Sequence, residues 1–216
     1  MCYTRCVQKI LLPVIFFLIF LVIGGVCVLA YALSRQKAPS VVSSAFSLQN
    51  APKDALIAQI ISFSGNLLWE SRTAVSPVPL TTSQPLQQGE ELITTKSGSA
   101  SVVFSGRVGI TFLPSTDISF IQTLPQNIVL LQNSGTAVYT TSSPQVFSLR
   151  ALGLLVESQT TASFRVTVTK TTVRITALHG TITLAYTDLQ DKSVVTTLQN
   201  PQQAVFDDFT ATLTQE

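Results

Sequence analysis

The sequence shows two hydrophobic patterns, a continuous apolar run near its N-terminus and an alternation of apolar and polar residues farther along. The run extends from Ile10 to Leu33, 24 residues without a charge. As an α-helix it would be about 36 Å long, more than the roughly 30 Å hydrocarbon core of a membrane. It therefore predicts a transmembrane helix over 10–33. Cleavage after Ala30-Tyr31-Ala32 is the alternative, but the run is longer than a usual signal-peptide core, so we expect a retained anchor.

Beyond the anchor the alternation has a period of two, as in a β-strand with one buried face. The clearest examples are Val108-Ile110-Phe112, Phe164-Val166-Val168 and Ile182-Leu184-Tyr186, and the segment from Thr171 to Leu178 is rich in β-branched residues. Turn-forming residues fall between the expected strands at Ser64-Gly65-Asn66, Gln88-Gly89-Glu90, Ser97-Gly98-Ser99, Ser105-Gly106, Asn133-Ser134-Gly135, His179-Gly180 and Asn200-Pro201. The fold class predicted is all-β: a single antiparallel domain, sandwich or roll-like, of many short strands.

These patterns divide the chain into four parts. We expect a short cytoplasmic tail over 1–9, the transmembrane helix over 10–33, a Pro- and Ser-rich linker over 34–54, and the β domain over 55–216. Within the domain, residues 76–85 contain three prolines and predict a surface loop or an insertion between two strands. A domain of this size can bury enough surface to fold without a metal or a disulfide.

Charge and cysteine content bear on the location of the domain. Only 11% of the residues are charged, and from residue 38 onward nine Lys and Arg stand against eleven Asp and Glu. The basic residues that flank the anchor are balanced, two on each side, so they give no orientation. The three cysteines are Cys2, Cys6 and Cys27, and the domain has none, which suits an oxidising compartment. We expect the N-terminus inside and the C-terminal domain outside the cytoplasmic (inner) membrane, in a single-pass arrangement.

Several short motifs follow one another in a recognisable order. They are Ser64-Gly65 after an opening strand, the segment Pro85 to Thr95, Gly98 to Val102, Phe104 to Phe112, Pro114 to Ile118, Leu130 to Val138, Val173 to Ile182, and Leu198 to Ala204. In this order they resemble the extracytoplasmic FecR-type domain of bacterial envelope proteins, over about 150 residues. The match departs from the family at Ser105, at Asn200-Pro201 and at Thr161 to Phe164, where the family has an acidic residue, a glycine and a Gly-Thr-Phe block.

The resemblance implies a β-rich outer domain. Family members that regulate iron-uptake transcription also carry a cytoplasmic anti-sigma segment before the membrane helix. Here nine residues precede the span, too few for a folded unit that binds a partner. The resemblance therefore implies the outer domain and leaves the signalling output as an alternative.

The inventory of reactive side chains argues against an enzyme. His179, the one histidine, stands at an expected strand-to-turn junction, and no nucleophile elbow or metal-ligand spacing is present. The acidic pairs Glu90-Glu91 and Asp207-Asp208 could contribute to a cation site, but adjacent residues on a strand point to opposite faces, so turns or edges explain them better. We expect no catalytic residue, no cofactor-binding residue, no metal site and no cofactor.

Other candidate features also have structural explanations. The segment Gly106-Arg107-Val108-Gly109 lacks the remaining residues of a phosphate-binding loop and predicts a strand turn. Trp69 is expected in the core or near the membrane, with a partner contact as the alternative, and Glu70 and Arg72 are expected at exposed strand positions. The scattered Lys and Arg residues exclude a nucleic-acid track.

The sequence thus favours a non-catalytic, membrane-anchored domain that binds another protein or a cell-envelope polymer such as cell-wall glycan. The alternative is a regulatory protein of FecR type that senses an envelope partner and signals through its helix. A third possibility is a subunit of a membrane complex, packed through Gly24 and Gly25 of the span. The oligomeric state is left open.

Overall fold

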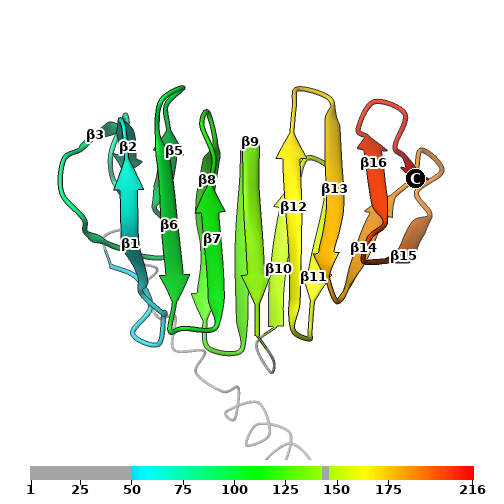
Figure 1. Cartoon of the computed structure of the whole chain (residues 1–216), viewed down its shortest axis with the longest axis horizontal. Helices are drawn as coiled ribbons and strands as arrows, with labels where there is room; N and C mark the ends of the chain where they lie inside the picture. The colour runs from blue at the N-terminus through cyan, green and yellow to red at the C-terminus, as the bar shows by residue number, and fades with distance from the viewer. Residues whose placement is uncertain (1–49, 143–145) are drawn as a thin grey trace, which may run out of the picture. The chain divides into compact units, whose positions relative to one another are not determined.

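Two β-sheets packed face to face form the part of the chain that the structure describes, residues 50–142 and 146–216 of a computed structural model. Sheet A contains, in spatial order, β4 (Pro85–Leu86), β1 (Ala58–Ser64), β6 (Ser99–Phe104), β7 (Val108–Phe112), the second half of β9 (Asn127–Thr141), β12 (Ala162–Val168), β13 (Thr172–His179), β16 (Gln203–Asp207) and β17 (Thr212–Gln215). In Figure 1 this sheet is the layer nearer the viewer.

Sheet B lies behind it (Figure 1). Its order is β3 (Val78–Leu80), β2 (Leu67–Glu70), β5 (Glu91–Thr94), β8 (Asp117–Leu124), the first half of β9, β10 (Val146–Ala151), β11 (Leu154–Ser158), β14 (Thr181–Thr187) and β15 (Ser193–Gln199). The described residues include no helix that could cross a membrane. The helix expected over 10–33, the tail and most of the linker lie outside the described residues.

The all-β prediction is confirmed, and the pairing is antiparallel with one exception. β9 and β10 run parallel, with Phe147 beside Ile128 and Leu149 beside Leu130. The chain can make this parallel pair because β9 leaves sheet B before it ends, and β10 then returns to sheet B on the other side of it. The prediction of a purely antiparallel domain of short strands is therefore wrong at β9, which has 15 residues and a parallel neighbour.

β9 joins the two sheets. Residues 127–134 pair with β8 in sheet B, and residues 135–141 pair with β7 and β12 in sheet A. The change of sheet occurs at Gly135, whose φ of 84° is open to glycine and costly for other residues. The sequence prediction of a turn at Asn133-Ser134-Gly135 is corrected here: the chain bends and continues as strand, because each half finds its own partners.

One hydrophobic core fills the space between the sheets, and the alternating residues of the sequence supply it. All but one of the nine residues in the three predicted alternating triplets are buried, the exception being Tyr186, which packs against the core from its edge. Aromatic rings bridge the layers: Phe104 of sheet A meets Phe120 of sheet B at 5.7 Å between centroids, and Tyr139 meets Phe147 at 5.5 Å. The layers are thus held by large apolar side chains that face each other, as expected for a sandwich.

Polar groups are buried where β9 crosses between the sheets. Tyr139 is fully buried, and its hydroxyl donates to Gln132 Oε1 at 2.9 Å. The amide of Gln132 donates in turn to the carbonyl of Gly135 at 2.9 Å and to that of Val166 at 3.3 Å. Nearby, the Thr116 hydroxyl donates to Thr136 O at 2.8 Å. We call these residues the crossing cluster. Its polar side chains at the bend have hydrogen-bond partners within the protein.

The remaining expected turns connect strands as predicted, and the Pro-rich segment is only partly a loop. Residues 76–85 contain the short strand β3 and begin β4, and Leu80 reaches the core. Pro79 and Pro85 stand on edge strands, where a missing N–H removes no bond to an inner neighbour, and Pro77 precedes β3. The segment therefore contributes an edge strand to each sheet, β3 to sheet B and β4 to sheet A.

Candidate functional site

Hydroxyl side chains cover the outer face of sheet A. Residues that alternate with core positions point away from the sandwich, and on the central strands most of them are Ser or Thr. We define the hydroxyl face as Ser101, Thr111, Thr136, Thr140, Ser163, Thr167 and Thr176. Thr136 and Thr167 stand opposite each other with their Oγ1 atoms 3.0 Å apart. The pairs Ser101–Thr111 and Thr140–Ser163 likewise place hydroxyls of neighbouring strands side by side.

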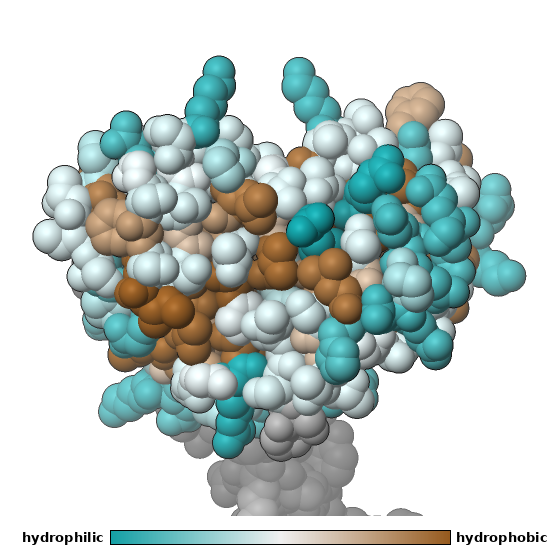
Figure 2. All heavy atoms as spheres, in the orientation of Figure 1, coloured by the Kyte–Doolittle hydropathy of each residue, from teal (hydrophilic) through white to brown (hydrophobic). Residues whose placement is uncertain are grey.

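Figure 2 looks onto this side of the domain. Most of the surface is near neutral in hydropathy, brown apolar patches cross its middle, and strongly hydrophilic groups gather towards the right-hand side (Figure 2). The outward valines Val103, Val138 and Val205 are half-buried between the hydroxyls, while Arg165 and Arg174 are exposed charges on β12 and β13. The face is therefore broad, mostly uncharged and mixed in polarity, as protein-binding surfaces commonly are.

A shallow hollow of about 170 Å³ lies at one end of this face, over β1, β6 and β7. Its lining is Ser62, Phe63, Ser64, Ser99, Ala100, Ser101 and Thr111. The register of β1 against β6 shifts between Ile60 and Ser62, so the pairing of β1 is irregular beside the hollow. The volume is below the roughly 300–1,000 Å³ of ordinary small-molecule sites. It is large enough to accept a single side chain of a partner.

Sheet B carries a different polar group on its outer face, at the end formed by β2, β5 and β8. Glu70 stands directly opposite Glu91, and Asp117 is one strand farther on. We call these three residues the acidic corner. Ser119 donates to Glu91 Oε2 at 2.7 Å, and Asn133 Nδ2 donates to Asp117 Oδ1 at 3.1 Å. The strands thus place three carboxylates near one another, and two neutral side chains donate hydrogen bonds to them.

This arrangement makes Asp117 a weak acid for its type. Partial burial raises the pKa of its carboxyl from 3.8 to about 6, with the negative charges of Glu91 and Glu70 adding to the rise. The hydrogen bond from Asn133 acts in the opposite direction and lowers it. Burial and like charge both disfavour the ionised form, so this carboxyl changes charge within the physiological range.

The acidic pairs singled out in the sequence do not converge on an ion. Glu90 points inward and accepts from the backbone N of Gln87 at 2.8 Å, while Glu91 points outward, so the pair lies on opposite faces. Asp207 closes the turn before β17 by accepting from Phe209 N and Thr210 N, and the Thr210 bond is the main reason that its pKa is lowered. Within the described ranges, no three His, Cys, Asp or Glu side chains are grouped to hold a metal.

Asp208 and His179 also have defined places. Asp208 Oδ1 accepts from Gly153 N at 2.8 Å and so ties the β10–β11 turn to the turn after β16. His179 is exposed at the end of β13, beside the Gly180 turn that was expected there. In the segment Gly106-Arg107-Val108-Gly109, the first two residues lie in the β6–β7 turn, with Gly106 at φ 68°, and the last two begin β7. None of these residues faces another reactive group across a cleft.

The prediction for the Trp69 ring is confirmed, and the prediction for Arg72 is wrong. Trp69 packs against the core from β2, with its indole N–H buried and without a hydrogen-bond partner among the described residues. Glu70 is a half-buried strand residue. Arg72 follows the strand, and its side chain lies against Gly89, so it is neither on a strand nor fully exposed. Sequence alternation could not show this, because the contact joins a loop to a distant turn.

Comparisons with known proteins define the fold. No family model matches the sequence, and no curated protein matches it. Two crystal structures, at 1.65 and 2.50 Å resolution, of a protein described as a candidate anti-sigma factor from Parabacteroides distasonis ATCC 8503 are similar. Each has a TM-score of 0.50 at 12% or 11% identity, and the match covers 58% of this chain and 58% of that one. The matched part of this chain therefore shares the fold of that protein, and the match spans little more than half of that protein.

Three surface features could not be predicted from the sequence: the hollow, the acidic corner and the edge of β15 that no other described strand pairs with. Each joins residues from strands that are far apart along the chain, or depends on what a strand lacks as a neighbour. A signal for the hydroxyl face was present, because Thr and Ser recur at the polar positions of the alternation. The sheet order that places them side by side was not readable.

Proposed function

We propose that this chain is a single-pass protein of the bacterial cytoplasmic membrane whose β domain lies outside the cytoplasm and binds another protein without catalysis. The hydroxyl face is the observation that carries the proposal. It is a continuous surface over at least five strands, with valines between the hydroxyls and two exposed arginines. Such a surface offers many hydrogen-bonding groups and little electrostatic penalty on burial.

A protein suits this face better than a cell-envelope polymer. Sugar rings are commonly held against aromatic side chains, and the defined hydroxyl face contains none. The hollow beside it is large enough for one side chain of a partner. The polymer remains the competing ligand, and the experiment below distinguishes the two.

The location is tested by protease treatment of intact cells or spheroplasts that express the full chain with a C-terminal tag. We expect loss of the tag and a membrane-bound N-terminal remnant that contains 10–33. A tag that is cut only after lysis would place the domain in the cytosol and overturn the outward orientation.

Binding is tested with a photo-crosslinking amino acid placed at Thr140 on the hydroxyl face. The matched control is the same amino acid at Glu157, which lies on the outer face of sheet B. We expect a discrete protein adduct from Thr140 alone, lost on Thr111→Lys. Sedimentation of the full chain with purified cell-wall sacculi, abolished by the same substitution, would favour the polymer; equal adducts from both positions would contradict a specific face.

A regulatory role is the second candidate, and the fold likeness to candidate anti-sigma factors favours it together with the order of FecR-type motifs. In this version the outer domain senses its partner and the segment before the span contacts a cytoplasmic regulator. Deletion of residues 2–9 should then change a defined set of transcripts. An unchanged transcript profile, with the protein still in the membrane, would count against signalling.

A further inference from the structure

The four outer strands of the two sheets are not protected in the same way. Exposed strand edges invite pairing with other chains, and proteins usually shorten them or interrupt them with proline or charge. Sheet B ends at β3, three residues long with Pro79, and sheet A ends at β4, two residues long with Pro85, and at the four-residue β17. The fourth edge is β15, whose seven residues Ser193–Gln199 include no proline and no charge.

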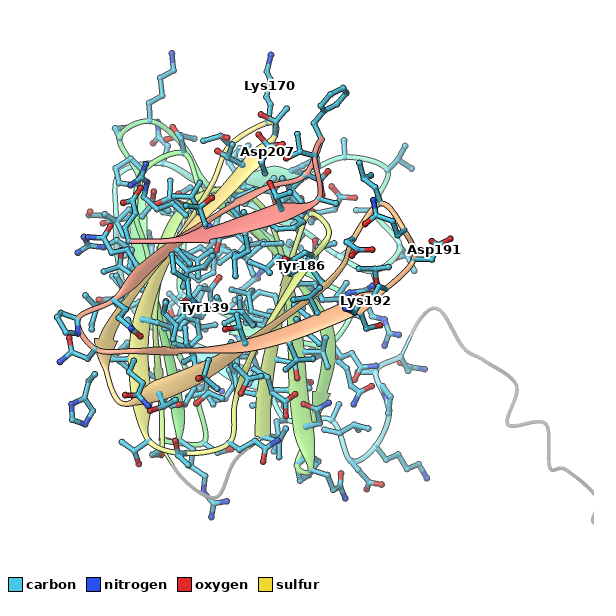
Figure 3. All side chains as sticks on the ribbon, turned by 90° about the vertical axis from the view of Figure 1, so that its right-hand side faces the viewer. Tyr139, Lys170, Tyr186, Asp191, Lys192 and Asp207 are labelled. Atoms are coloured by element: carbon cyan, nitrogen blue, oxygen red, sulfur yellow. The ribbon has the colours of Figure 1, made fainter. Side chains whose placement is uncertain are left out.

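β15 pairs with β14 on one side, and within the described part of the chain no strand pairs with its other side. Figure 3 looks onto this side of the domain, with Asp191 and Lys192 in the turn at one end of the strand. Bonds at its far end show which groups face outward: Gln199 N donates to Gln202 Oε1 at 2.8 Å, and Thr197 O accepts from Gln215 Nε2 at 3.4 Å. Since alternate residues face opposite ways, Ser193, Val195 and Thr197 direct their backbone groups away from β14.

The outward groups form a short, symmetric set centred on Val195. Gln199 is engaged by the β15–β16 turn and Thr197 O by the side chain of Gln215, which leaves open the N–H of Thr197 and both backbone groups of Ser193 and Val195. The side chain of Val195 is 67% exposed, one of the more exposed large apolar residues of the domain. We propose that this edge pairs with the same edge of a second copy of the chain, antiparallel, with Val195 opposite Val195.

The second copy is favoured because the pairing is self-complementary. In this register Ser193 of each copy stands opposite Thr197 of the other, so each open N–H meets a carbonyl. One of these carbonyls, Thr197 O, already accepts from Gln215 at 3.4 Å and has a second lone pair for the Ser193 N–H. Lys192 falls opposite Leu198, and the two Lys192 residues are kept about 20 Å apart at about 3.4 Å per residue, so no like charges meet. The inference goes beyond the proposed function, since β15 belongs to the other sheet from the hydroxyl face.

The chain outside the described residues is long enough for this geometry. The twofold axis of an antiparallel strand pair is perpendicular to the sheet, so the two domains would point in opposite directions along their strands. The linker predicted over 34–54 has 21 residues and can extend to roughly 70 Å, against about 25 Å for a seven-residue strand. Two copies anchored in one membrane can therefore meet edge to edge, and anchoring raises their effective concentration.

Cysteine crosslinking of the full chain tests the register. Cys2, Cys6 and Cys27 are first changed to Ser, which leaves no thiol in the chain. Val195→Cys then places two thiols on residues whose Cα atoms would be about 5.5 Å apart, within disulfide range. The matched control, Thr197→Cys, lies on the same strand and face, but its copy would be offset by four residues, about 13 Å.

We expect oxidation of membranes from freshly broken cells to give at least tenfold more disulfide-linked dimer from Val195→Cys than from Thr197→Cys. Equal yields, or no dimer from Val195→Cys, would overturn the proposal. An adduct of Val195→Cys whose mass is not that of two chains would also overturn it and would indicate a strand from a different protein.

A charge substitution gives a second, independent measurement. Val195→Lys would place two ammonium groups opposite each other, whereas Thr197→Lys would face Ser193. Light scattering of the full chain in detergent should show a dimer for the wild type and for Thr197→Lys, and a monomer for Val195→Lys with an unchanged Tm. A dimeric Val195→Lys variant would refute edge pairing.

Discussion

The domain contains two polar clusters that differ in their surroundings, the crossing cluster and the acidic corner. Gln132 and Tyr139 in the crossing cluster are fully buried, and each is bonded to a protein partner. The acidic corner lies on the outer face of sheet B, where solvent reaches its carboxylates and only two neutral side chains support them. The first cluster therefore determines whether β9 can change sheets, while the second changes its charge with little effect on the fold.

The largest effect is expected from Gly135→Ala in the crossing cluster. A Cβ at this position would overlap the backbone of Ser115 and Thr116, and φ is 84°. We expect a loss of about 3 kcal/mol or more in the free energy of unfolding, since both strain and overlap oppose the native bend. Urea unfolding of residues 50–216, which contain the whole described core, measures it.

Gly106→Ala is the matched control for this substitution. Gly106 has a similar φ of 68°, but a Cβ there would meet nothing within 4 Å. We expect a loss of only about 1 kcal/mol, the cost of the left-handed backbone alone. Similar losses for the two variants would show that close packing at the bend is unimportant.

The next effect in size is expected from Tyr139→Phe. The substitution keeps the ring contacts with Phe147 and Phe164 but leaves Gln132 Oε1 without its donor. An unpaired buried acceptor costs about 1–3 kcal/mol. The control is Tyr186→Phe, at the edge of the core. It should lower the free energy of unfolding by less than half as much in the same urea titration.

A smaller, pH-dependent effect is expected at the acidic corner. Asp117 has a pKa of about 6 in the folded domain and 3.8 as its ordinary value, so between these pH values the folded state holds the extra proton. The contribution of this carboxyl to stability is therefore full below about pH 4 and is lost as the pH rises through 6. Because solvent screens a partly exposed group, we expect the loss to be about 1 kcal/mol.

Asp117→Asn tests this directly, since the amide keeps an oxygen that can accept from Asn133. The variant should be more stable than the wild type at pH 8 and equal to it at pH 4, as measured by thermal unfolding across this range. Asp191→Asn, in an exposed turn, is the control and should leave the pH profile of the wild type unchanged. A wild-type profile that is flat between pH 4 and 7 would contradict the assignment.

The smallest effect is expected at the ion pair between Arg174 and Glu216. Its atoms are 3.8 Å apart, and both side chains are more than half exposed. Arg174→Ala should cost less than about 0.5 kcal/mol, and the difference should vanish in 1 M salt. A larger, salt-resistant loss would mean that Arg174 supports the hydroxyl face through packing.

Much of the fold could be predicted from local sequence. The triplets led by Val108, Phe164 and Ile182 became strands with their apolar residues towards the core, because a period of two allows one buried face and few alternatives. The turn expected at Asn133-Ser134-Gly135 shows where local sequence misleads. The residues have turn chemistry, but partners on β8 and β12 keep the chain extended on both sides of the bend.

The candidate sites were less predictable. The absence of converging His, Cys or Ser motifs led to the expectation of a non-catalytic domain, which stays a prediction. The acidic corner could not be found in advance, because Glu70, Glu91 and Asp117 come from three strands that the sequence does not order. The contact of the Arg72 side chain with Gly89 could not be predicted for the same reason.

By itself, the sequence determined the all-β class, the apolar residues of the core and the hydroxyl character of the outward positions. Each of these depends on the two-residue alternation of side chains along a strand, which is a local property. Only the tertiary structure decided which strands are neighbours, where β9 changes sheets and that, among the described strands, β15 pairs on one side alone. These depend on contacts between residues that are distant along the chain, where many pairings satisfy the same alternation and packing selects one.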